Sequence, residues 1–224
     1  QTTVASAGNL TSAVYRIFGK PFSEEGKKLF GVPFAQFLKL NSEFRYHYRI
    51  DKNQIIASRI AGGVIWSYGN ATTAPYTEQF YIGGANSVRA FSARSIGPGG
   101  YPPETDRKYT YINHVGDIRI EANIEYRFRM IADLHGAVFL DAGNVWLMRK
   151  DENRPNGEFT LKNFPKQIAL GTGFGLRYDL DFLVFRLDLG IGLHDPYDTG
   201  KSGYYNIPKF KDSMALHFAI GYPF

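Results

Sequence analysis

Residues 117–130 read DIRIEANIEYRFRM, and every second side chain in this stretch is apolar or aromatic. The side chains between them are charged or carry an amide, so the two sets separate with a period of two residues. That is the period of a β-strand, in which successive side chains point to opposite faces. The stretch is longer than the five or six residues usual in soluble sheets. It suits a strand that crosses a membrane, which needs about 9–11 residues.

The same alternation recurs along the chain and predicts eight strands, at residues 2–17, 43–50, 56–66, 117–130, 138–143, 170–178, 185–193 and 214–224. Short turns near 51–53, 131–133 and 179–181 alternate with long loops near 18–33, 67–115, 147–166 and 194–212. Short turns on one side and long loops on the other are typical of outer-membrane barrels. We therefore predict one all-β domain over 1–224, an antiparallel transmembrane β-barrel with both termini periplasmic.

The last seven residues, FAIGYPF, carry the alternation to the end of the sequence. Chain ends usually fray, whereas the last strand of a membrane barrel must pair to leave no open edge in lipid. The pattern predicts a closing strand in which Phe218, Tyr222 and Phe224 share one face and Gly221 lies on the other.

The composition agrees with an all-β protein. There are 15 Tyr, 18 Phe and 24 Gly, the mean hydropathy is -0.27, and no apolar run approaches the roughly 18 residues of a membrane helix. Cysteine is absent, which excludes disulfides and thiolate sites. A net charge of +5 is compatible with anionic lipid headgroups. No signal peptide opens the chain, so we expect Gln1 to begin a processed or truncated form.

Alternation alone does not say which face points inward. A soluble, ligand-binding barrel of the lipocalin type has the same period with an apolar interior. Two observations favour the membrane sense, in which outer-membrane lipid covers the apolar face. The polar face mixes both signs of charge with glycines, which suits a crowded lumen, and aromatic residues gather near strand ends, as in interfacial girdles. A small structural barrel or passive pore is the other alternative.

A loop of nearly fifty residues joins the third and fourth predicted strands, and loops of this length are usually functional or disordered. It contains GGANSVRAF at 83–91, and FLDAGNVW follows at 139–146. These motifs resemble the BamA/TamA superfamily of outer-membrane assembly and secretion barrels, the bacterial surface antigen family. In that family a Val-Arg-Gly-Phe/Tyr loop folds back into the lumen. The matching residues here are Val88, Arg89, Ala90 and Phe91, with Ala90 where the family prefers glycine.

Residues 123–128, 173–177 and 218–224 resemble the neighbouring family strands, in the same order, over about the last two-thirds of the chain. The family barrel has sixteen strands and follows periplasmic polypeptide-transport-associated domains. The resemblance implies that this chain holds only the last eight strands and none of those domains. It also implies that Arg89 binds Glu125 and Asp141 and pins the loop inside. The alternative is a solvated Arg89, with the carboxylates paired to Arg127 or Arg177.

The function implied by the resemblance is non-catalytic insertion or translocation of proteins at the bacterial outer membrane. The expected partners are outer-membrane lipid, unfolded outer-membrane protein clients and accessory assembly proteins. Whether eight strands close alone, or a half barrel self-associates, is left open.

Other chemistry has little support in the residues. The stretch 194–196, His-Asp-Pro, reads as a turn and not as a metal site. His47 and Glu43 share a polar face without a serine nucleophile beside them. The Gly-Pro-Gly-Gly run at 97–100 lacks the Lys-Ser/Thr of a phosphate loop, and the basic residues are scattered among acids, which argues against nucleic acid. We therefore predict no catalytic residue, cofactor or metal.

Overall fold

The computed structural model describes residues 1–22, 26–102, 113–180 and 182–224. Its elements are β1 (Thr2–Ala7), α1 (Asn9–Ile17), β2 (Lys28–Leu29), β3 (Val32–Pro33), β4 (Phe37–Arg49), β5 (Gln54–Ser67), β6 (Ile118–Ile131), β7 (Leu134–Trp146), η2 (Phe164–Gln167), β8 (Ala169–Asp179), β9 (Val184–His194), η3 (Phe210–Ser213) and β10 (Met214–Ile220). The predicted turn at 179–181 includes residue 181, which lies outside these ranges.

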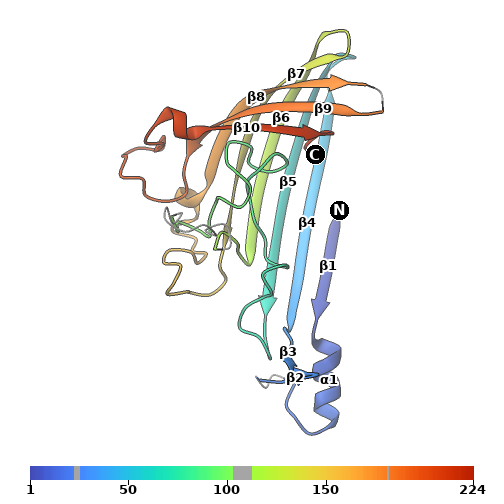
Figure 1. Ribbon diagram of the computed structural model, residues 1–224, viewed down its shortest axis with the longest axis vertical. Helices are drawn as coiled ribbons and strands as arrows, with labels where there is room; N and C mark the ends of the chain where they lie inside the picture. The colour runs from blue at the N-terminus through green and yellow to red at the C-terminus, as the bar shows by residue number, and fades with distance from the viewer. Residues whose placement is uncertain (23–25, 103–112, 181) are drawn as a thin grey trace.

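Eight strands form one antiparallel sheet in the order β1-β4-β5-β6-β7-β8-β9-β10 (Figure 1). The prediction of an all-β antiparallel fold is confirmed, and this sheet has the eight strands predicted. β2 and β3 form a separate two-stranded sheet within the long loop predicted at 18–33. Within the described ranges, β1 pairs only with β4 and β10 only with β9. The sheet is therefore a curved wall with two open edges and not a closed barrel. No helix in the described ranges is both long and apolar enough to cross a membrane.

The first predicted strand is too long. Pairing with β4 ends at Ala7, and Gly8 then takes a φ of +72°, in the left-handed region. A Cβ at Gly8 would lie 2.8 Å from the Gln36 side chain, so only glycine fits this turn. Beyond it, Leu10, Val14 and Ile17 repeat with helical spacing, and α1 forms where the strand pattern was weakest.

The two faces of the wall are oriented as predicted, with the apolar face outward and the polar face inward. On the outer face Ile124 is 47% exposed and Phe218 is 68% exposed. Glu125 and Asp141, on the opposite face, are 0% exposed. Apolar side chains thus line the outside of the wall, and buried ionic side chains line the inside.

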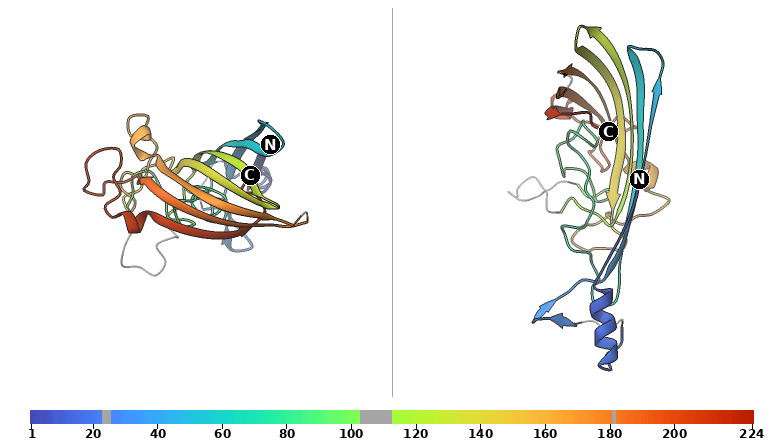
Figure 2. Two further views of the ribbon diagram at one scale, coloured as in Figure 1. Left: turned by 90° about the horizontal axis from the view of Figure 1, so that it is seen from above. Right: turned by 90° about the vertical axis from the view of Figure 1, so that its right-hand side faces the viewer.

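The described parts of the β5–β6 loop, residues 68–102 and 113–117, lie on the inner side of the wall (Figures 1 and 2). The loop brings its own apolar side chains, because Ile82, Val88 and Ile96 are buried against Ile65 of β5 and Val145 of β7. This small core anchors the loop to β5 and β7. Because Val88 of this core adjoins Arg89, the core helps to position Arg89 on the inner side of the wall.

The closing strand is shorter than predicted. Phe218 lies in β10, but the strand ends at Ile220, and Gly221 has a φ of +82°. The tail therefore bends into the lumen, where Phe224 is 7% exposed. The guanidinium carbons of Arg59 and Arg127 lie 5.4 Å and 5.6 Å from the centre of its ring. Cation–π attraction in this sheltered position stabilises the bend. Because the strand ends at Ile220, the prediction of a strand through Tyr222 and Phe224 is wrong.

Replacing Gly221 by Val is expected to straighten the tail. No atom lies within 4 Å of a Cβ built at Gly221, so the cost is conformational, about 1–2 kcal/mol for an L-residue in the left-handed region. With Pro223→Cys as reporter in a chain that has no other cysteine, maleimide labelling should become about five- to thirtyfold faster. Gly221→Asn, which tolerates this conformation, is the control. Equal labelling rates for Gly221→Val and the parent chain would contradict the expectation.

Candidate functional site

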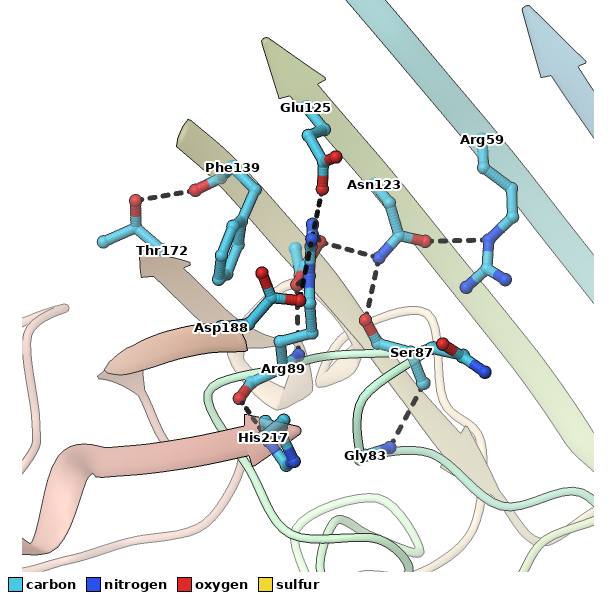
Figure 3. A network of polar contacts seen from close by, with 12 residues as sticks. Arg59, Gly83, Ser87, Arg89, Asn123, Glu125, Phe139, Thr172, Asp188 and His217 are labelled. Carbon is cyan, nitrogen blue, oxygen red and sulfur yellow. Dashed lines mark hydrogen bonds and ion pairs between the residues drawn. The ribbon is translucent and has the colours of Figure 1, made fainter. Parts of the chain in front are cut away.

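Arg89 at the tip of the loop is fully buried and binds two strands at once (Figure 3). Its Nε and Nη2 donate to the two oxygens of Asp141 on β7, at 2.8 Å and 3.0 Å. Its Nη1 donates to Glu125 on β6. The guanidinium carbon also lies 3.5 Å from the centre of the Phe139 ring. This bidentate contact with a carboxylate, shielded from water, is among the strongest polar contacts a side chain makes.

The backbone around Arg89 takes part as well. Its N–H donates to Asp141 Oδ2 at 3.0 Å. Asn123 of β6 donates from Nδ2 to Asp141 Oδ1 at 2.8 Å and to the Ser87 carbonyl at 3.0 Å. Arg59 of β5 donates in turn to Asn123 Oδ1 at 3.0 Å. The loop tip is therefore held by main-chain and side-chain contacts together, which restricts its position and its orientation.

The ionic network continues beyond the loop. Glu125 also accepts hydrogen bonds from Arg127 Nε at 2.7 Å and from Arg177 Nη2 at 3.1 Å. Arg177 of β8 donates to Asp188 of β9 at 2.6 Å. The alternative pairing considered from the sequence, with Arg127 or Arg177, thus exists alongside the Arg89 contact and does not replace it. Buried charges at this density require such mutual pairing, because unpaired ones are strongly disfavoured.

Two glycines make the seat in which the loop backbone lies. A Cβ at Gly171 of β8 would overlap the Cβ of Ala90, and one at Gly190 of β9 would lie 2.6 Å from the carbonyl carbon of Arg89. The main chain of residues 89 and 90 therefore rests directly on the sheet. Ala90 is not among the residues with positive φ, so alanine fits where the family prefers glycine.

Replacing Gly190 by Ala is expected to unseat the loop. The added methyl group meets main-chain atoms that cannot rotate away, and overpacking of this kind costs typically 1–3 kcal/mol. Protease cleavage within residues 83–96 of the folded protein should then become faster. The matched control is Gly192→Ala on the same strand and face, where the nearest atom lies 3.4 Å from the new Cβ. Equal cleavage of the two variants would show that the loop does not rest on Gly190.

The structure brings Arg89, Glu125 and Asp141 together, with Val88 in the adjoining apolar core. Phe91 packs against the edge of that core. Sequence reasoning missed the residues that extend the network. They are Asn123, Asp188 and Ser87, together with Arg186, whose Nε lies 3.5 Å from Asp188 Oδ2, and His217, whose Nε2 lies 2.8 Å from the Arg89 carbonyl oxygen. All but Ser87 lie on the polar face of a strand, so the alternation was their signal. It separates the two faces of each strand but does not say which side chains of one face meet.

The contacts of the described residues hold a loop in place. Glu43 pairs with Arg45 and not with His47. Both ring nitrogens of His194 contact backbone carbonyls, those of Tyr204 and Lys166. Within the described ranges, no group of three or more His, Asp or Glu side chains could hold a metal ion. The site can hold the tip of the loop on the inner side of the wall, and the tip is released when the contacts of Arg89 break.

The sequence is similar to one protein family and to individual members of it. Residues 28–224 match the family model described as the Omp85 superfamily domain. The outer membrane protein assembly factor BamA of Nitratidesulfovibrio vulgaris is 28% identical over 204 residues, which cover 89% of this chain and 22% of that protein. The BamA of Neisseria meningitidis serogroup B is 29% identical over 89 residues, 38% of this chain and 11% of that protein. This chain therefore spans about a fifth of the length of the first relative.

Among solved structures, BamA from Haemophilus ducreyi lacking POTRA domains 1–3 superimposes with a TM-score of 0.56 at 16% identity. The superposition covers 83% of this chain and 35% of that one. This likeness concerns the fold: the open wall corresponds to part of a larger barrel.

Proposed function

Since this chain belongs to the Omp85 superfamily, we propose that it forms the last eight strands of an outer-membrane barrel that inserts or translocates other proteins. The long relative it matches is named an outer membrane protein assembly factor. The observation that carries the proposal is the buried contact of Arg89 with Glu125 and Asp141 beside an open-edged wall. Because the loop is bound on the inner side of the wall, we propose that a client protein binds at the open edges of the sheet.

The proposed mechanism is non-catalytic. Backbone N–H and C=O groups on the free side of an edge strand are unsatisfied in lipid, so an incoming client strand gains hydrogen bonds by pairing there. The clients are unfolded outer-membrane proteins, and accessory assembly proteins would deliver them to the full-length protein. The seated loop would hold β6 and β7 together on the inner side of the wall.

We infer the orientation of the chain in the membrane from the lengths of its connections. β1 runs toward the end of the wall that carries the long connections, and β10 runs away from it. The long connections belong on the outer side of the bacterial outer membrane and the short turns on the periplasmic side. Both termini of this chain would then face the periplasm.

The test is reconstitution of the purified full-length protein in lipid vesicles, with an unfolded outer-membrane protein as client. Heat-modifiable gel mobility measures how fast the client folds. We expect folding to be faster than in empty vesicles. Ion conductance without faster client folding would instead show a passive pore, and extraction without detergent would show a soluble barrel. A particle mass of two copies would assign the open edges to self-association.

A further inference from the structure

Within the described ranges, the edge strand β10 pairs with β9 alone. On its inner face it presents Ala215, His217 and Ala219, and all three are partly buried. Alanine side chains offer no hydrogen bond, so His217 is the one inward-facing side chain of Met214–Ile220 that can bond to another element. Any side-chain hydrogen bond from this strand to the lumen therefore comes from residue 217.

That hydrogen bond exists. The Nε2 of His217 lies 2.8 Å from the carbonyl oxygen of Arg89 (Figure 3). A carbonyl oxygen only accepts, so Nε2 carries the hydrogen and donates it. The contact joins residues 128 positions apart. It reaches the very residue whose side chain is bonded to β6 and β7.

The glycine seat explains why the carbonyl is within reach. The register pairs Gly190 of β9 with Ala215 and Asp188 with His217. Because Gly190 has no side chain, the main chain of Arg89 lies flat on β9, and its carbonyl oxygen points across to β10. A larger residue at 190, or a raised loop, would carry the oxygen out of hydrogen-bond range.

We infer that His217 is a positioning residue that ties the open edge strand to the seated loop. Arg89 then connects β6, β7 and β10 through its side chain and carbonyl, so unseating the loop loosens the edge. Coupling of this kind is reciprocal: a strand that displaces β10 also weakens the hold on the loop. The inference rests on the proposed function only for the role of the edge as the place where clients pair.

Hydrogen exchange of the purified full-length protein in vesicles tests the coupling. Peptides covering 85–92 and 214–220 are followed in the parent chain, in His217→Leu and in His217→Gln, whose amide can donate in place of Nε2. Loss of one hydrogen bond should speed exchange about threefold to tenfold in both peptides for His217→Leu. His217→Gln should restore most of the protection. Leu216→Ile, on the outer face of the same strand, is the matched control and should change neither peptide.

Faster exchange in 214–220 with an unchanged loop peptide would overturn the inference, since His217 would then stabilise only its own strand. So would a Gln variant no better protected than Leu. Heat-modifiable mobility of each variant confirms that the wall itself has folded. If the coupling is seen in a protein that does not speed client folding, the proposed function fails and this inference stands.

Discussion

Replacing Arg89 by Met is expected to lower the free energy of unfolding by about 3–5 kcal/mol, the usual result when one partner of a buried ion pair is removed. Asp141 would remain fully buried with no guanidinium beside it, since its other donors in the described structure are Asn123 and the N–H of residue 89. Glu125 would keep Arg127 and Arg177. The loss therefore falls mainly on the Asp141 contact. Denaturant unfolding in detergent, followed by gel mobility, measures it.

Two further variants separate this pair from a general effect of lost charge. Arg49→Met removes an exposed arginine at the end of β4 and should change the free energy of unfolding by less than about 0.5 kcal/mol. Arg89→Met combined with Asp141→Asn removes both charges and should recover part of the loss. If Arg89→Met unfolds like Arg49→Met, the buried contact does not hold the loop. Faster protease cleavage of residues 83–96 in Arg89→Met, with strands intact, is the expected companion result.

Replacing Ile124 by Arg should destabilise the protein in a bilayer by about 2–4 kcal/mol, the range for a cation at the midplane on the lipid face of a barrel. Ile124 is the seventh of the fourteen residues of β6 and lies on the outer face, 47% exposed. In a soluble barrel the same exposed position would tolerate arginine within about 0.5 kcal/mol. Urea unfolding of vesicle-inserted protein, monitored by gel mobility, gives the value.

Met130→Arg is the matched control, because it lies on the same strand close to the turn that follows β6. Near the interface the cost falls to about 0–1 kcal/mol. A large difference between the two variants places the apolar face in lipid. Equal and small effects at both positions would mean that water covers this face, and the membrane reading would fail.

The local order of the chain could be predicted from the sequence. In residues 117–130 the period of two determines both the strand and its faces, because side chains of a strand alternate whatever lies around them. That is why Glu125 and Asp141 could be assigned to the polar faces of their strands. The mixed charges on those faces and the aromatic residues near strand ends indicated that these faces point inward. The motif around Arg89 pointed to the same two carboxylates only by resemblance to a family.

Tertiary structure decided the rest. Alternation places His217, Asp188 and Arg177 on the polar faces of their strands, but contacts among them depend on strand register, sheet curvature and the path of the loop over Gly190. None of these is a local property of the chain. The chain likewise bends at Gly221, although the apolar alternation of the tail predicts a longer strand. A glycine in the left-handed region and the contacts of two arginines with Phe224 stabilise the bend more than continued pairing with β9 would. Sequence determined which side chains face the lumen, and the folded wall determined which of them touch.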